Sequence, residues 1–135
     1  MSLAVADARR TALLAWFEGR GRDLPWRRTR DPWAVLVSEL MLQQTQVARV
    51  VPRYDAFLDR FPTVSALAAA PLADVLALWQ GLGYNRRGMM LQRAAVEIMA
   101  RHGGQVPTET VDLVRLPGIG PYTARAVLAF AGERD

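Results

Sequence analysis

The stretch LPGIGPYTA, residues 116–124, places two glycines around one apolar residue and follows them with a proline and an alanine-rich segment. Gly118 and Gly120 can adopt positive φ and let a backbone approach closely, and Pro121 suits the first turn of a helix, where its missing N–H costs nothing. Free N–H groups and the positive end of the helix dipole then face one point, which favours an anion. The stretch predicts a hairpin between helices that holds a phosphate through Gly118, Ile119 and Gly120. An ordinary turn between two helices is the alternative.

The rest of the chain indicates an all-α fold. Its 135 residues, of which 51% are hydrophobic and 22% charged, suffice for one globular domain with a real core. Glycine and proline separate short apolar segments, and no alternating strand pattern occurs. We expect an N-terminal helix and arm over residues 1–30 and a helical domain over residues 31–132. The expected helical segments are residues 6–18, a helix that Asp31 caps and Pro32 begins, residues 46–60, 64–69, 72–79 and 86–101, and the helix-hairpin-helix at about 109–131.

The charge of the chain favours a nucleic-acid partner. The net charge is +4, and all 17 basic residues are arginine, whose forked guanidinium suits phosphates. A compositional bias toward arginine is an alternative cause, but the electrostatic consequence is the same. Cysteine is absent, so we expect no disulfide, no thiolate metal site and no cofactor within this chain. No apolar run has the length of a membrane span, and residues 1–19 do not resemble a secretory signal, so we expect a cytoplasmic protein associated with the nucleoid.

A second chemical element is SELMLQQTQV, residues 38–47. Glu39, Gln43 and Gln46 follow one another at i, i+4 and i+7, which predicts one polar helical stripe opposite an apolar core face. Amide side chains can hydrogen-bond base edges or fill the space that an extruded nucleotide leaves, and a carboxylic acid can protonate a leaving group. A solvated helix face is the alternative interpretation. The apolar face comprises Trp33, Leu36, Val37, Leu40 and Met41.

Several motifs in one order carry a resemblance to a known family. They are LPW at 24–26, SELMLQQTQV, FPTVSALAAAPL at 61–72, LWQGLGY at 78–84 and LPGIGPYTA. Together, over residues 22–131, they resemble the helix-hairpin-helix DNA glycosylases of the A/G-specific adenine (MutY) type. The resemblance implies a six-helix barrel domain, here truncated, that acts as a monomer on double-stranded DNA with an adenine mispair. Such a protein kinks the duplex, extrudes an adenosine that faces 8-oxoguanine or guanine, and cleaves its N-glycosidic bond.

The resemblance also implies roles for individual residues. Glu39 matches the acid that protonates the adenine ring, and this requires a pocket that desolvates the carboxyl group. Tyr122 takes the place of a lysine nucleophile found in relatives that resemble endonuclease III, and it supports the sugar pocket. Since the chain has no lysine, we expect a monofunctional glycosylase that leaves the strand unbroken.

The remaining roles belong to DNA contacts. Arg22, Leu24, Trp26 and Arg27 match the arm that walls the adenine pocket; packing of the arm on the domain is the alternative for Leu24 and Trp26. Gln44 and Tyr84 resemble residues that wedge into the duplex, although Tyr84 is equally compatible with a loop aromatic that covers the core. Arg86 and Arg87 are expected to contact phosphate, or otherwise only to solvate the start of a helix.

The chain departs from the family at its end. The family's second carboxylate, in an Asp-x-Asn-Val setting, has no match, because Asp135 does not fit that motif. A four-cysteine loop for a 4Fe-4S cluster and a C-terminal domain are also missing, which implies a fragment of a larger protein with little activity of its own. Two other functions stay open: a non-catalytic helix-hairpin-helix module that binds duplex DNA, and a mismatch thymine glycosylase.

Overall fold

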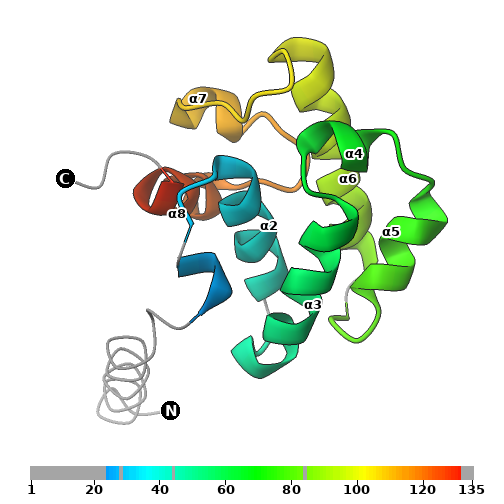
Figure 1. The fold of residues 1–135 in the computed structure, drawn as a ribbon. Helices are drawn as coiled ribbons and strands as arrows, with labels where there is room; N and C mark the ends of the chain where they lie inside the picture. The colour runs from blue at the N-terminus through cyan, green and yellow to red at the C-terminus, as the bar shows by residue number, and fades with distance from the viewer. Residues whose placement is uncertain (1–23, 28, 44, 84, 132–135) are drawn as a thin grey trace, which may run out of the picture.

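The computed structural model describes residues 24–27, 29–43, 45–83 and 85–131, and this part of the chain forms helices and no strand (Figure 1). The all-α prediction is therefore confirmed. The helix expected over residues 6–18 lies outside the described residues. The elements are the 3₁₀ turn η2 (Pro25–Arg27) and the helices α2 (Pro32–Leu42), α3 (Val47–Arg60), α4 (Val64–Ala68), α5 (Leu72–Trp79), α6 (Asn85–Arg101), α7 (Thr110–Leu113) and α8 (Pro121–Ala131).

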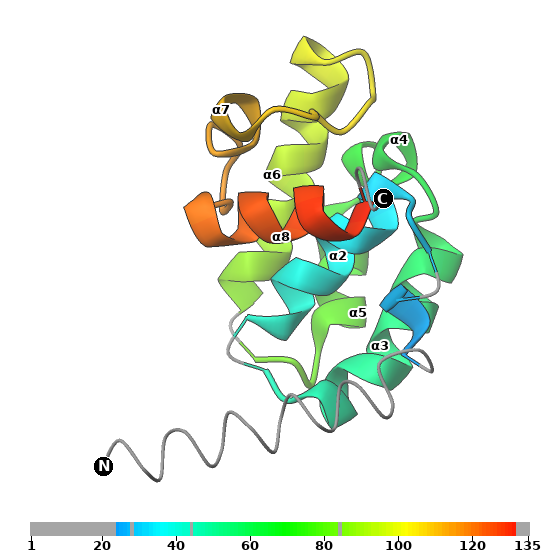
Figure 2. The same ribbon diagram turned by 90° about the vertical axis from the view of Figure 1, so that its left-hand side faces the viewer.

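Helix α2 lies at the centre of the molecule, in contact with α3, α6, α8 and η2 (Figures 1 and 2). It begins as the sequence predicts: the Asp31 carboxylate accepts a 3.1 Å hydrogen bond from the Trp33 N–H, and Pro32 occupies the first turn. The expectation of one buried face is wrong, however, because every residue from 33 to 41 is buried. A helix with neighbours on all sides must be buried all round, including its polar residues Ser38 and Glu39.

Helix α3 buries one stripe against the core. Val50, Tyr54 and Phe57 follow one another at i, i+4 and i+7, and all three are buried. The helix ends at the aromatic residue Phe61, whose N–H donates to the Phe57 carbonyl at 2.8 Å. The Phe61 carbonyl in turn accepts a 3.0 Å hydrogen bond from the Trp33 indole N–H, which fixes the start of α2 to the end of α3.

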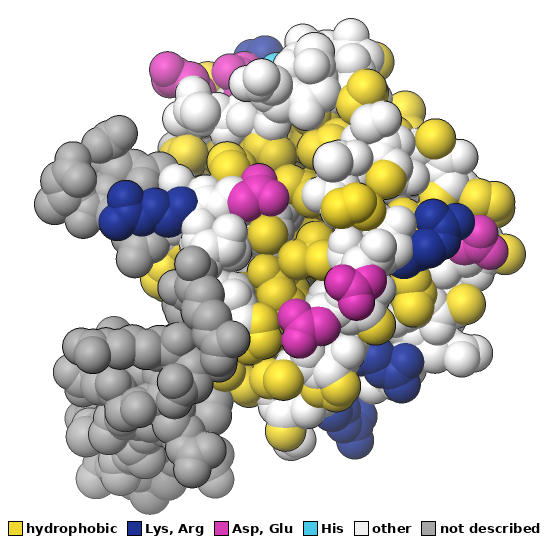
Figure 3. All heavy atoms as spheres, in the orientation of Figure 1, with side chains coloured by type: hydrophobic (Ala, Val, Ile, Leu, Met, Phe, Trp, Pro, Cys, Tyr) yellow, Lys and Arg dark blue, Asp and Glu magenta, His cyan; other side chains and the backbone are white. Residues whose placement is uncertain are grey.

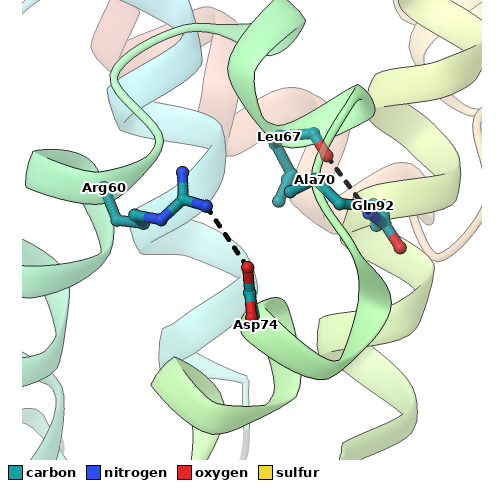
Figure 4. Close-up of polar contacts among 5 residues, drawn as sticks. All are labelled: Arg60, Leu67, Ala70, Asp74 and Gln92. Atoms are coloured by element: carbon teal, nitrogen blue, oxygen red, sulfur yellow. Dashed lines mark hydrogen bonds and ion pairs between the residues drawn. The ribbon is translucent and has the colours of Figure 1, made fainter.

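A second junction joins α4 to α6 (Figure 4). The Gln92 amide donates to two carbonyls at the end of α4, Leu67 O at 3.2 Å and Ala70 O at 2.7 Å. These bonds fasten the end of α4 and the turn after it to α6; the Leu67 carbonyl also accepts from the Ala70 N–H at 3.2 Å. The ion pair between Arg60 and Asp74, 3.3 Å apart, joins α3 to α5, but both side chains are about half exposed, so the pair adds little stability.

The hairpin follows α7 and leads into α8. Leu113, Leu116 and Ile119 are buried and anchor the hairpin to the core. Figure 2 shows α8 beside α2, with the first turn of α8, the last turn of α2 and the first half of α6 at the same side of the molecule. This side therefore brings together three segments that are far apart in the sequence.

The surface is mixed in character. On the face in Figure 3, hydrophobic atoms occupy the middle, and the arginine side chains lie in separate groups rather than in one continuous patch. Within the described ranges, no helix combines the length and the apolar character that crossing a bilayer requires.

Candidate functional site

An open cleft of about 780 Å³ lies where α2 ends, α6 begins and the hairpin enters α8. Its position matches the convergence of the three segments at one side of the molecule (Figure 2). The cleft therefore unites the two sequence elements that were expected to carry chemistry. Its lining residues are Gln43, Arg86, Arg87, Met90, Gly118, Gly120, Pro121, Tyr122 and Thr123.

One of the two hairpin glycines is required by the backbone geometry. Gly118 has φ of +78°, and a Cβ atom there would lie 2.9 Å from the Met90 Cβ, so only glycine fits this approach to α6. Gly120 does not adopt positive φ, and a Cβ atom there would meet nothing within 4 Å. The expected positive φ is therefore present at Gly118 and not at Gly120.

The N–H groups of the hairpin differ in their availability. The Ile119 N–H donates to the Leu116 carbonyl at 3.2 Å, so it is already engaged within the hairpin. In the described part of the chain, the N–H groups of Gly118, Gly120 and Tyr122 donate to no backbone carbonyl. Gly120 and Tyr122 lie at the start of α8, where the helix dipole is positive, and Gly118 precedes them in the hairpin. This arrangement suits phosphate.

Tyr122 and Thr123 stand side by side on the first turn of α8 but face different surroundings. The Tyr122 side chain is 76% exposed, which leaves its ring available for a ligand in the cleft. Thr123 is buried, and its hydroxyl accepts a 2.8 Å hydrogen bond from the Gln43 amide. This bond ties the end of α2 to the start of α8.

Glu39 lies on α2 one helical turn before Gln43, and only 8% of it is exposed. For Glu39, the interpretation as part of a solvated helix face is therefore wrong. The predicted stripe of Glu39, Gln43 and Gln46 is wrong as well, because α2 ends at Leu42 and Gln46 is the exposed N-cap of α3. Glu39 does not line the cleft itself; Gln43, four residues further along the chain, does.

The two arginines at the start of α6 have different environments. Arg86 is exposed and lines the cleft, as a phosphate contact requires. Arg87 is half-buried, and its guanidinium donates to the Leu40 carbonyl at 3.2 Å and to the Thr45 hydroxyl at 3.3 Å. Arg87 thus does more than solvate the start of a helix, because it also holds the end of α2.

The arm packs on the domain. Trp26 is fully buried and meets Tyr54 edge-on, with ring centroids 5.4 Å apart, and Leu24 is 6% exposed. This burial agrees with the packing alternative, and their contact with adenine stays a prediction. Arg27 lies in η2. Arg22 and the expected wedge residues Gln44 and Tyr84 lie outside the described residues.

Sequence reasoning missed several members of the site. Thr45, Met90 and Thr123 were not singled out, although Thr123 lies within the hairpin motif. Its place two residues after Pro121, in the expected first turn of the helix, is a signal that could have drawn attention to Thr123. For Met90 and Thr45 the sequence offers no such signal. No group of three or more potential metal ligands occurs among the described residues.

Comparison with known proteins identifies the class to which this fold and cleft belong. Residues 37–129 match the model of the HhH-GPD superfamily of base excision DNA repair proteins. The matched segment contains the second half of α2, with Glu39, and the hairpin. The chain belongs to this superfamily.

Within this superfamily, the chain is similar to several individual DNA glycosylases. The chain is 52% identical over 120 residues to an adenine DNA glycosylase of Mycolicibacterium smegmatis, with 88% of this chain and 41% of the relative covered. It is 44% identical over 138 residues to a human adenine DNA glycosylase, with 96% and 25% covered. The solved structure of a thermostable thymine-DNA glycosylase superimposes with a TM-score of 0.78 at 29% identity, over 93% of this chain and 58% of that one. The chain thus spans less than half the length of these two adenine glycosylases.

Proposed function

We propose that the protein is an adenine DNA glycosylase, which removes adenine that faces 8-oxoguanine or guanine in duplex DNA. The similarity to relatives named adenine DNA glycosylase supports the choice of base. The observation that carries the proposal is the hydrogen bond between Gln43 and Thr123, because it joins the helix of Glu39 to the hairpin helix. One nucleotide can thereby meet the anion site while its base approaches α2.

The proposed mechanism uses the cleft as the DNA contact. The free N–H groups of Gly118 and Gly120, together with the Arg86 guanidinium, hold a phosphate beside the extruded nucleotide. Gln44 and Tyr84 fill the space that the nucleotide leaves, and the arm with Arg22, Leu24, Trp26 and Arg27 walls the adenine pocket, while the burial of Leu24 and Trp26 holds the arm on the domain. Because Tyr122 is exposed in the cleft, its ring lies against the sugar.

The proposed bond cleavage starts from Glu39. Its carboxyl group gives a proton to the adenine ring, and the electron pair of the glycosidic bond passes to the base, which leaves as neutral adenine. The sugar gains oxocarbenium character and takes up water, whose proton is lost to solvent. The burial of Glu39 supports this role, because a proton donor to an extruded base must act in a site that excludes bulk water.

The proposed product is an abasic site in an intact strand. A Schiff-base nucleophile needs an amine, the chain has no lysine, and Tyr122 occupies the position after the hairpin. An iron–sulfur cluster does not fit this chain, because cysteine is absent. If the full-length gene product holds a 4Fe-4S cluster, its ligands lie outside these 135 residues.

A thymine glycosylase is the second candidate, since the solved structure of a thymine-DNA glycosylase has a similar fold. The test is base release by the full-length gene product from duplexes with adenine opposite 8-oxoguanine, adenine opposite guanine, and thymine opposite guanine. We expect adenine release without strand cleavage, and a loss of about a hundredfold or more in Glu39→Gln with retained DNA binding. Thymine release alone, or unchanged activity of Glu39→Gln, would overturn the proposal.

A further inference from the structure

Four residues join two turns beside the cleft to the end of α2. Arg87 donates through one guanidinium nitrogen to the Leu40 carbonyl at 3.2 Å and through the other to the Thr45 hydroxyl at 3.3 Å. The Thr45 hydroxyl donates to the Leu82 carbonyl at 3.1 Å and lies 3.3 Å from the Gln43 carbonyl. We call Leu40, Thr45, Leu82 and Arg87 the Arg87–Thr45 clip.

The Thr45 hydroxyl is the centre of the clip. It has one proton, which the Leu82 and Gln43 carbonyls share, and a lone pair that accepts from Arg87. Through this one oxygen, the turn between α2 and α3 is bound both to the turn between α5 and α6 and to α6 itself. Loss of the hydroxyl would therefore release two turns at once.

The guanidinium suits the other half of the clip. The carbonyl at Leu40 is near the C-terminus of α2, where the last carbonyls lack an intrahelical partner. A planar guanidinium presents two nitrogens in a fixed fork and reaches this carbonyl and Thr45 together, whereas the single ammonium of lysine is a point donor. The neighbouring Arg86 is exposed and is not part of the clip.

We infer that the Arg87–Thr45 clip positions these two turns against the DNA duplex while the target nucleotide is extruded. The inference rests on the proposed function and adds two positioning residues to it. Of the expected wedge residues, Gln44 directly precedes Thr45 in the sequence, and Tyr84 lies between Leu82 and Arg87. Extrusion of the nucleotide uses both wedge residues at a fixed separation, and the clip joins the two turns that carry them. Loss of the clip should therefore slow extrusion, while the affinity for undistorted DNA stays the same.

The test compares Thr45→Val with Thr45→Ser and Arg87→Lys in the full-length gene product. Valine keeps the volume of threonine and removes the hydroxyl, and serine keeps the hydroxyl. We expect single-turnover adenine release to fall about tenfold or more in Thr45→Val and Arg87→Lys, with Kd for a fully paired duplex changed by less than about twofold. Thr45→Ser should stay within about twofold of the unchanged protein. The double variant Thr45→Val/Arg87→Lys should release adenine at a rate within about twofold of the slower single variant. The two effects should not multiply, because both substitutions break the same contact.

A purely structural role would predict a lower Tm with a normal release rate far below that Tm. Normal release by a folded Thr45→Val protein, or effects of the two substitutions that multiply, would overturn the inference. Amide hydrogen exchange gives a readout without catalysis: exchange in residues 43–47 and 80–86 should accelerate together in Thr45→Val and not in Thr45→Ser. If the unchanged protein releases no base, the proposed function fails, and unchanged exchange in both segments would separately show that the clip does not exist.

Discussion

Gln43 and Thr123 are 80 positions apart in the sequence, yet the Gln43 amide donates a 2.8 Å hydrogen bond to the Thr123 hydroxyl. Gln43 is the C-cap residue of α2, the helix that carries Glu39, and Thr123 lies in the first turn of α8. The bond therefore fixes the distance between the proposed proton donor and the hairpin. This distance must match the separation between a nucleotide's phosphate and its base.

Thr123→Val tests the relationship between α2 and α8. Valine removes the acceptor and leaves the Gln43 amide partly buried, so we expect a loss of about 1–2 kcal/mol in the free energy of unfolding. Adenine release should fall as well, because Glu39 shifts relative to the hairpin. Thr123→Ser keeps the hydroxyl and should restore both properties. Urea denaturation and single-turnover release measure them, and equal behaviour of the two variants would speak against a role for the bond.

Gly118→Ala should destabilise the protein by about 1–3 kcal/mol. Alanine is strained at φ of +78°, and its Cβ would lie 2.9 Å from the Met90 Cβ, so the hairpin must move away from α6. Gly120→Ala is the matched control for stability, because Gly120 lacks positive φ and has open space around it. Chemical denaturation of both variants provides the comparison, and equal losses would contradict the geometric argument.

The helix boundaries could be predicted because their signals are local. The Asp31-Pro32 pair starts α2 as expected, and residues 72–79 form α5 without a shift. Two glycines close α6: Gly103 and Gly104 both have positive φ, and the Gly104 N–H donates to the Ile98 carbonyl at 3.1 Å. Each of these signals depends on residues that are neighbours in the sequence.

The burial of α2 and the contacts at the cleft could not be predicted in this way. Glu39 is buried because α3, α6 and α8 surround its helix, and no pattern within residues 38–47 reveals these neighbours. Likewise, Arg87 and Thr45 are 42 positions apart, so their contact exists only once the helices pack. The sequence pattern identified Glu39 as a candidate acid, but only packing determines its surroundings.

At high pH, the free energy of unfolding should fall in the unchanged protein and should not show this fall in Tyr54→Phe. Burial raises the pKa of Tyr54 to about 12, with further increases from the carboxylates of Asp55 and Asp31. Below pH 10, both the folded and the unfolded chain keep the phenol proton of Tyr54. The stabilisation of the folded state by the buried Tyr54 side chain is therefore fully present there. Between pH 10 and 12 the unfolded chain loses this proton first, and the protein should lose about 2–3 kcal/mol relative to Tyr54→Phe. Urea denaturation across this range checks the difference, and parallel curves for the two proteins would refute it.

Arg86→Ala should weaken DNA binding by a purely electrostatic route. If Arg86 contacts one phosphate, the slope of log K against log salt should become shallower by about 0.9, with the same change for matched and mispaired duplexes. Arg101→Ala is the control, because Arg101 is also exposed but lies 15 residues further along α6, or about 22 Å away. Fluorescence anisotropy over a salt series measures both slopes. An unchanged slope in Arg86→Ala would contradict a phosphate contact by Arg86 in the cleft. A change in the preference for a mispaired duplex would indicate that Arg86 contacts bases.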